Sequence, residues 1–322
     1  MRHALLLVGG LSLLAPLGSL LGALDWRLEL FGHFLPHAGV ALLLAALAAQ
    51  PVWLRLGFAL VGLASLAHVL LVLGSASPAQ PDPQAGTLRV LSVNLNLDNP
   101  EMAALIAQVQ DLQPDLLLLI EVTPSQWRAL APLRQGFAHG CSRPQDGPFG
   151  MALLSRLPLQ ACTVEGQPGM PVIVATLSGT PLTLVGLHPP PPLNGTLAAL
   201  RQAQLRHWGE RLTGRSEGLL LGDLNLTPWS PLYRDLLART GLHDARAGRG
   251  YFATWPATLG AFGLPLDQAL LGADWQARAL HSLPVAGSDH RALLLDLAVG
   301  APGEALSNRP RAGPFAALGD NR

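Results

Sequence analysis

Three long apolar stretches fill the first 74 residues of this 322-residue chain, at residues 4–24, 34–49 and 57–74. Only five side chains in this region are charged: Arg2, Asp25, Arg27, Glu29 and Arg55. A helix of about 20 residues spans a hydrocarbon core of about 30 Å. The stretches therefore predict three transmembrane helices in residues 1–74, of which the middle one is the shortest.

The flanks of these stretches predict how the chain is oriented. A cleaved signal peptide is the alternative interpretation of the first stretch, because Arg2 precedes it and small residues lie near its end. The two further apolar stretches favour retained helices. Arg2 precedes the first stretch and Arg55 the third, and cytoplasmic loops carry an excess of Arg and Lys. We therefore expect a multi-pass inner (plasma) membrane protein whose large C-terminal part lies outside the cytoplasm.

Composition divides the rest of the chain into three parts. Residues 75–86 are rich in Pro, Ser and Ala and predict an extended linker. Residues 87–299 have the length of one large α/β domain with a substantial core. Residues 300–322 mix Pro, Gly, Ala and Arg without an apolar pattern, which predicts a disordered tail.

The charge balance and the cysteines limit the classes of function. The formal net charge is zero, whereas proteins that bind nucleic acid non-specifically usually present a basic surface. The absence of Lys from the chain excludes P-loop, kinase-type and Schiff-base chemistry that depends on one. Cys141 and Cys162 are the only cysteines; a disulfide between neighbouring strands is expected if the domain is exported, and two free thiols if it is cytosolic.

Polar side chains follow several of the predicted buried strands. Apolar runs at residues 90–96, 116–121 and 219–225 each end in an acid or an amide, and Ser-Asp-His at 288–290 directly precedes another apolar run. Helical spacing of apolar residues separates the first two runs, so the domain opens as strand, helix, strand. Acids, amides and His gathered at one rim of a sheet can hold a hard metal ion beside a phosphate.

Six motifs in the order of one family carry a resemblance across residues 88–297. They are Ser-Val-Asn-Leu-Asn (92–96), Pro-Asp-Leu-Leu-Leu-Leu-Ile-Glu (114–121), Gly-Leu-His (186–188), Gly-Asp-Leu-Asn (222–225), Pro-Leu-Asp (265–267) and Ser-Asp-His (288–290). The domain resembles the endonuclease/exonuclease/phosphatase superfamily, and the apolar helices before it resemble its membrane-bound bacterial type. The resemblance implies an α/β fold, a four-layered sandwich of two packed β-sheets flanked by helices, preceded here by three transmembrane helices.

The resemblance also implies a metal site. Glu121 is similar to the principal metal carboxylate of the family, and Asn96 occupies the position of a residue that supports the ion. Asn94 resembles the amide that orients the surroundings of the metal, and Asp289 matches a residue of the metal region. Mg²⁺ keeps several waters and needs few protein ligands, so such a sparse set is sufficient. The expected cofactor is Mg²⁺, with Mn²⁺ as the alternative ion.

Five further residues resemble the catalytic groups of the family. Asp223 and Asn225 match the pair that activates the attacking water and holds it, or the phosphate, in line. His290 resembles the histidine that contacts the scissile phosphate, and Asp267 the acid that orients its imidazole. His188 resembles a second histidine that faces the phosphate or the leaving group. Gln268 departs from the family, in which His often follows the acid, so we expect a difference in local packing.

The implied activity is hydrolysis of a phosphodiester by metal-assisted in-line attack of water, as in a nuclease. A phospholipid phosphodiesterase, a lipid or inositol phosphatase, and a non-catalytic membrane module that keeps only the fold are the alternatives. A serine hydrolase is disfavoured because Ser288 lies in no Gly-x-Ser-x-Gly motif. The expected partners are a phosphoester substrate, either nucleic acid or a phospholipid head group, and the lipid bilayer; no protein partner is implied.

Overall fold

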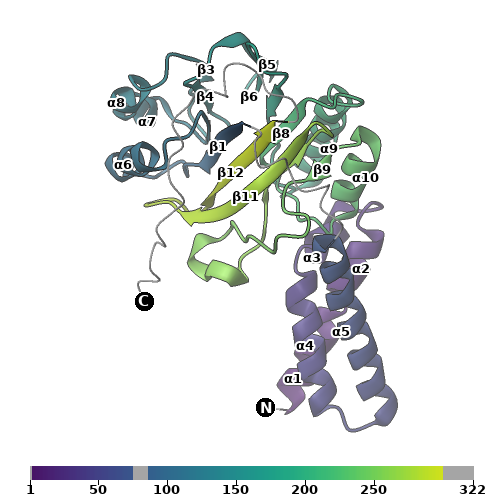
Figure 1. Ribbon diagram of the computed structural model, residues 1–322. Coiled ribbons are helices and arrows are strands. Elements are labelled where there is room, and N and C mark those ends of the chain that lie inside the picture. The colour runs from purple at the N-terminus through teal and green to yellow at the C-terminus, as the bar shows by residue number, and fades with distance from the viewer. Residues whose placement is uncertain (1, 75–85, 300–322) are drawn as a thin grey trace.

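The computed structural model describes residues 2–74 and 86–299, with a bundle of apolar helices on one side and a large α/β domain on the other (Figure 1). The predicted linker, apart from residue 86, and the predicted disordered tail lie outside the described residues.

The helix bundle contains two or three candidate membrane spans. Helices α1 (Arg2–Ser12) and α2 (Leu14–Leu21) together form one apolar span, and α5 (Val52–Leu73) forms another. Between them, α3 (Trp26–Gly32) and α4 (Leu35–Ala48) are bent by 66° against each other, so this pair is a broken span or a re-entrant loop. The described residues therefore provide two helices able to cross a membrane, or three if the bent pair counts as one.

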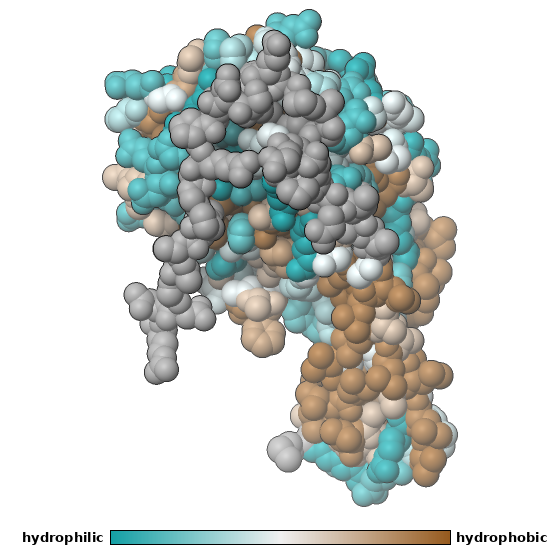
Figure 2. Space-filling view, in the orientation of Figure 1, coloured by the Kyte–Doolittle hydropathy of each residue, from teal (hydrophilic) through white to brown (hydrophobic). Residues whose placement is uncertain are grey.

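The two arginines used to predict orientation lie at the same end of the bundle. Arg2 donates a hydrogen bond from Nε to the carbonyl of Ala48 at 3.1 Å, and Arg55 donates from NH2 to the carbonyl of Ala49 at 3.0 Å. This end lies far from the α/β domain and is hydrophilic, whereas the shaft of the bundle is hydrophobic (Figure 2). Many apolar side chains on the shaft are exposed, as expected for helices that face lipid.

Two six-stranded sheets form the core of the domain. The first has the order β11-β12-β1-β2-β4-β3, with β1 Thr87–Asn94, β2 Leu116–Ile120, β3 His139–Arg143, β4 Met151–Ser155, β11 Trp275–Pro284 and β12 Arg291–Val299. The second has the order β5-β6-β7-β8-β10-β9, with β5 Leu159–Gln167, β6 Met170–Leu177, β7 Thr183–Gly186, β8 Gly218–Asp223, β9 His243–Asp244 and β10 Asp267–Leu271.

Helices cover the outer faces of both sheets, so the domain has four layers. One hydrophobic cluster fills the space between the sheets. A second lies between the first sheet and helices α6 (Met102–Leu112), α7 (Pro124–Ala129) and α8 (Ala131–Arg134). A third lies between the second sheet and helices α9 (Gly195–Glu210) and α10 (Pro231–Thr240). The predicted α/β sandwich is confirmed.

Burial explains which strands the sequence predicted. All five residues of β2 are buried, because both faces of the sheet are covered, and such a strand appears as a continuous apolar run. Strands β3, β5, β9 and β11 were not predicted. They lie at the edges of their sheets and keep most side chains partly or fully exposed, so their sequences lack an apolar run. Helix α10 begins at Pro231, after its N-cap Ser230.

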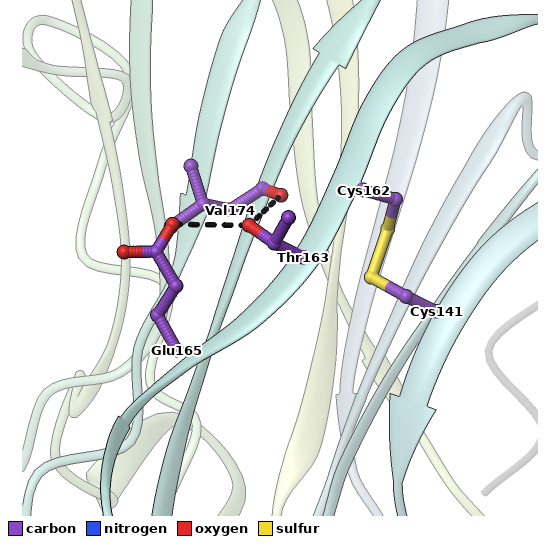
Figure 3. Close-up of a disulfide and its surroundings, with 5 residues drawn as sticks. All are labelled: Cys141, Cys162, Thr163, Glu165 and Val174. Atoms are coloured by element: carbon purple, nitrogen blue, oxygen red, sulfur yellow. Dashed lines mark hydrogen bonds between the residues drawn. A yellow bond between two sulfur atoms is a disulfide. The ribbon is translucent and has the colours of Figure 1, made fainter.

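A disulfide joins the edge strands of the two sheets. Cys141 in β3 and Cys162 in β5 are bonded, with their Cα atoms 5.7 Å apart (Figure 3). The sequence left open a disulfide or two free thiols. A disulfide is the alternative expected for an exported domain, because cytosolic thiols are kept reduced.

Candidate active site

The register of two parallel strand pairs brings four polar side chains to one rim of the sandwich. In the first sheet Asn94, at the end of β1, is level with Ile120 of β2, and Glu121 follows directly. In the second sheet Gly186 of β7 is level with Leu221 of β8, so His188 and Asp223 lie at equivalent positions just beyond. Parallel strands end at the same edge, which explains how residues distant in sequence meet here.

Two antiparallel pairs complete this rim. Strand β10 runs against β8 with Asp267 directly opposite Asp223. Strand β12 runs against β1, and its pairing of Leu293 with Ser92 brings His290, just before β12, next to the end of β1. The hydroxyl of Ser288 donates to the carbonyl of Asn94 at 2.7 Å and so ties the two segments together.

Asp223 lies at the centre of the site. Its Oδ2 accepts a hydrogen bond from Nδ2 of Asn94 at 3.3 Å. The same oxygen lies 3.7 Å from Nε2 of His188 and 3.6 Å from Nε2 of His290. Burial raises the pKa of Asp223, and the positive charge of His290 acts in the opposite direction. The site therefore combines a buried carboxylate with two imidazoles and one amide donor.

His290 is held by the second carboxylate. Its Nδ1 donates a hydrogen bond to Oδ2 of Asp267 at 2.9 Å, and both side chains are buried. Burial is the largest single influence and lowers the pKa of His290. The negative charges of Asp267 and Asp223, with the hydrogen bond, outweigh it and raise the pKa to about 10. The imidazole is therefore a cation at neutral pH.

Glu121 is a carboxylate without a cationic partner. Its Oε1 accepts from Nδ2 of Asn94 at 3.1 Å, and its Oε2 accepts from the backbone N–H of Leu97 at 3.0 Å. Its φ of 62° is left-handed and turns the chain sharply at the end of β2. Throughout residues 2–74 and 86–299, no Arg or His forms an ion pair with it within 4.0 Å.

The donor set near Glu121 fits a hard divalent cation. Each of its oxygens accepts one hydrogen bond and keeps a free lone pair, and carboxylate and amide oxygens are the ligands that Mg²⁺ and Mn²⁺ prefer. Ligand atoms of Asp223, Asp267 and His290 also lie within 4.8 Å of one another. In that cluster, however, Asp267 and His290 are already hydrogen-bonded to each other. We therefore favour Glu121 as the ion-holding group. Asn94 orients it, because Nδ2 of Asn94 donates to Oε1 of Glu121 and its Oδ1 accepts from the N–H of Asn96.

The remaining predicted residues lie around this centre. The backbone N–H of Asn225 donates to Oδ1 of Asp223 at 3.0 Å, and its Nδ2 donates to the carbonyl of Pro189 at 3.0 Å. Asn96 is half-buried and uses its Oδ1 to accept from the N–H of Asp98 at 3.3 Å. Neither Asn96 nor the exposed Asp289 contacts Glu121 or Asp223 directly. Asp289 instead accepts a hydrogen bond from Nε1 of Trp255 at 3.0 Å.

Several groups that shape the site were not predicted from the sequence. Pro148 and Phe149 are two of them. The carbonyl of Pro148 lies 3.1 Å from Nδ1 of His188 and is hydrogen-bonded to it, and the ring of Phe149 contacts the imidazole, with ring centroids 5.5 Å apart. Trp255 holds Asp289, as described above. These groups come from segments without a motif, so no local pattern marks them.

Gln268, the departure from the family pattern, has a packing role. It is fully buried, and its Nε2 donates to the carbonyls of Leu226 at 2.6 Å and Pro265 at 2.7 Å. Its Oε1 accepts from Arg246 at 2.5 Å. The side chain thus bridges the segments that follow β8 and precede β10.

A family model matches the chain across this site. The model of the Endonuclease/Exonuclease/phosphatase family matches residues 91–290, which is more than half of the chain and includes all of the predicted site residues. Comparison with curated protein sequences gives no match.

Solved structures share the fold at low sequence identity. The human Nocturnin catalytic domain with bound sulfate has a TM-score of 0.54 and 20% identity, covering 66% of this chain and 94% of that one. The 3'-5' exonuclease NExo from Neisseria meningitidis has a TM-score of 0.51 and 21% identity, covering 65% and 98%. D. rerio TDP2 complexed with single strand DNA product has a TM-score of 0.53 and 18% identity, covering 66% and 98%.

The geometry of Glu121 predicts binding of a divalent cation that can be measured without turnover. Mn²⁺ or Mg²⁺ should raise the melting temperature of the full-length protein in detergent, because an ion that binds only the folded state stabilises it. Glu121→Gln should abolish this shift, whereas Glu101→Gln, which changes an exposed acid nearby, should not. An equal shift in the Glu121→Gln protein would refute the assignment.

Proposed function

The chain belongs to the endonuclease/exonuclease/phosphatase family of metal-dependent phosphoester hydrolases, and we propose that it is a membrane-anchored enzyme that hydrolyses a phosphodiester with Mg²⁺ bound. The contacts of Asp223 carry this proposal. One carboxylate oxygen faces two imidazole Nε2 atoms and shares the amide of Asn94 with Glu121. This arrangement combines a base and phosphate-binding donors, which are buried, with a cation site at the half-buried Glu121.

On the metal side of the proposed site Glu121 would hold the ion and Asn94 would orient its carboxylate, with Asn96 and Asp289 nearby. When bound, Mg²⁺ supplies positive charge to the phosphate oxygens. The role of Asn94 is to keep the Glu121 carboxylate and the Asp223 carboxylate at a fixed separation, because its Nδ2 donates to both. Mn²⁺ satisfies the same oxygen ligands.

The catalytic side uses the other residues for proton transfer and orientation. Asp223 takes a proton from the attacking water, and Asn225 holds the water or the phosphate in line. Charged His290, oriented by Asp267, donates to the phosphate and stabilises the negative charge that develops on it. His188 faces the same oxygen of Asp223 and donates to the phosphate or the leaving group.

Membrane anchoring and export of the domain are part of the proposal. The apolar helices support anchoring. Arg2 and Arg55, at the end of the bundle far from the domain, support a cytoplasmic position for that end. The disulfide between Cys141 and Cys162 independently supports an oxidising compartment for the domain.

A lipid phosphoester is the second candidate substrate, and exposed apolar side chains beside the site favour it. In residues 86–299 the large hydrophobic side chains that are exposed are Leu193, Leu259 and Phe262. Leu193 follows the loop that begins at His188. The other two lie in the 3₁₀ helix η1 (Ala257–Phe262), whose first N–H donates to the carbonyl of Asp289 at 2.7 Å.

The segments that carry these exposed apolar side chains adjoin the helix bundle. His37 at the start of α4 hydrogen-bonds through Nε2 to the carbonyl of Phe262 at 2.7 Å. Gly195, two residues after Leu193, lies close to Trp26 in α3: a Cβ atom built on Gly195 would be 3.5 Å from Nε1 of Trp26. Loops that lead from the site to the membrane boundary suit a substrate whose phosphate lies at the bilayer surface.

The His290→Ala variant tests the proposed catalysis. We expect the wild-type full-length protein, in detergent or liposomes with Mg²⁺, to cleave at least one of plasmid DNA, bis-p-nitrophenyl phosphate and phospholipid. His290→Ala should lower kcat by about 10²- to 10⁴-fold, because it removes the charged donor. His281→Ala, which changes an exposed histidine, is the control. Equal rates for the wild type and His290→Ala on every substrate would contradict the proposed role, and the preferred substrate decides between nucleic acid and lipid.

The raised pKa of His290 predicts how activity depends on pH. The pKa of about 10 keeps the imidazole charged, so its stabilising interactions are complete below about pH 6.5 and are lost as the pH rises through about 10. Asp267→Asn removes the largest charge that raises this pKa, so the alkaline fall in kcat should shift to lower pH. Profiles of kcat against pH for the wild type, Asp267→Asn and the surface control Asp274→Asn measure this. An unshifted profile for Asp267→Asn would contradict the role of Asp267 in raising the pKa of His290.

The disulfide offers a test of the proposed location. If the domain is exported, Cys141 and Cys162 should resist alkylation in intact cells until a reductant is added, because they are oxidised there. Mass spectrometry of the alkylated peptides, with and without reductant, measures this. Complete labelling without reductant, together with a C-terminal reporter that is active only in the cytoplasm, would contradict export.

A further inference from the structure

A carboxylate from the helix bundle is buried against the active-site domain. Glu29, in the first turn of α3, is fully buried, and its Oε2 pairs with NH2 of Arg201 in α9, 172 positions away in the sequence. Its Oε1 accepts a hydrogen bond from the hydroxyl of Ser230 at 2.8 Å. A charge without water must be paired, and this one hydrogen-bonds to two side chains of the α/β domain. Within the bundle, Nε2 of His33 lies 3.6 Å from the same Oε1.

Arg201 connects this carboxylate to the active site. The side chain is fully buried, and while NH2 contacts Glu29, NH1 donates to the backbone carbonyl of Asn225 at 2.8 Å. The guanidinium is a rigid planar fork, so fixing one of its nitrogens fixes the direction of the other. Glu29 therefore determines where Arg201 presents its donor to Asn225.

Asn225 needs such support because its backbone is left-handed, with a φ of 51°. Its N–H is bonded to Asp223 and its side-chain Nδ2 to the carbonyl of Pro189. The contact from Arg201 to its carbonyl is the third tether. Without it, rotation about the following peptide would be less restricted, and the side chain of Asn225 would lose its fixed direction.

The residues that follow Asn225 rest on the same part of the bundle. His33 hydrogen-bonds through Nδ1 to the hydroxyl of Thr227 at 3.0 Å, and its carbonyl accepts from Nε1 of Trp229 at 3.0 Å. The hydroxyl of Ser19 donates to the carbonyl of Trp229 at 3.2 Å. The segment between β8 and α10 thus lies against the helix bundle along its length.

From these contacts we infer that Glu29 is a positioning residue of the enzyme, which acts through Arg201 to fix Asn225 in the active site. The inference rests on the role of Asn225 in the proposed function. It means that the helix bundle is a structural part of the catalytic unit as well as an anchor. A fragment that begins at residue 86 lacks Glu29 and leaves Arg201 without its counter-charge.

A double-mutant cycle on the full-length protein tests this inference. Glu29→Gln keeps the shape of the side chain and removes its charge; we expect kcat to fall about tenfold with little change in KM, because a displaced orienting group costs rate. Arg201→Lys should act similarly, since Lys lacks the fork that reaches both partners. In an Asn225→Ala background, Glu29→Gln should change kcat less than about twofold. Asp25→Asn, which alters a surface carboxylate that contacts Arg27, is the matched control.

Hydrogen exchange provides a readout that does not need turnover. Amides of residues 224–230 should exchange about tenfold faster in Glu29→Gln than in the wild type or in Asp25→Asn, because local opening becomes easier. If exchange rises but no substrate is cleaved by the wild type, the proposed function fails and the positioning contact stands. Unchanged exchange, unchanged kcat in Glu29→Gln, or an equal loss of kcat in both backgrounds would overturn the inference.

Discussion

Two buried carboxylates face each other across the pair of strands β8 and β10, and the rest of the site depends on how their repulsion is offset. Asp223 and Asp267 are directly opposed in the register, an arrangement that destabilises a sheet when both are charged. His290 contacts both of them, and their combined charge keeps it protonated. The pair of acids and the imidazolium therefore stabilise one another, and the domain retains a strong hydrogen-bond donor beside a carboxylate.

The topology of the sandwich delivers the other groups to this centre. Two parallel pairs, β1 with β2 and β7 with β8, end at the same rim of the packed sheets, so Asn94 and Glu121 come from one sheet and His188 and Asp223 from the other. Asn94 bridges the sheets by donating to a carboxylate of each. The disulfide between Cys141 in β3 and Cys162 in β5 also joins the two sheets, at their edge strands.

The sequence was informative where chemistry is local. Apolar runs with both faces buried, such as β2, predicted the central strands, and the side chains just beyond them, such as Glu121 and Asp223, predicted the rim. The edge strands β3, β5, β9 and β11 were not predicted, because most of their side chains are partly or fully exposed and form no apolar run. The bend between α3 and α4 was not predicted either, since composition alone does not distinguish a straight span from a broken one. The contact of Glu29 with Arg201 is beyond any local pattern, because it joins two segments that only the folded chain brings together.

The proposed mechanism requires a single site in which a cation held by Glu121 lies beside a phosphate held by His188 and His290. Anomalous diffraction from crystals of the full-length protein, soaked with Mn²⁺ and inorganic phosphate, locates both groups in one experiment. We predict an Mn²⁺ peak about 2.2 Å from a carboxylate oxygen of Glu121, with phosphate density in contact with both imidazoles. An ordered Mn²⁺ ion bound away from Glu121, or phosphate on another face of the domain, would contradict the account.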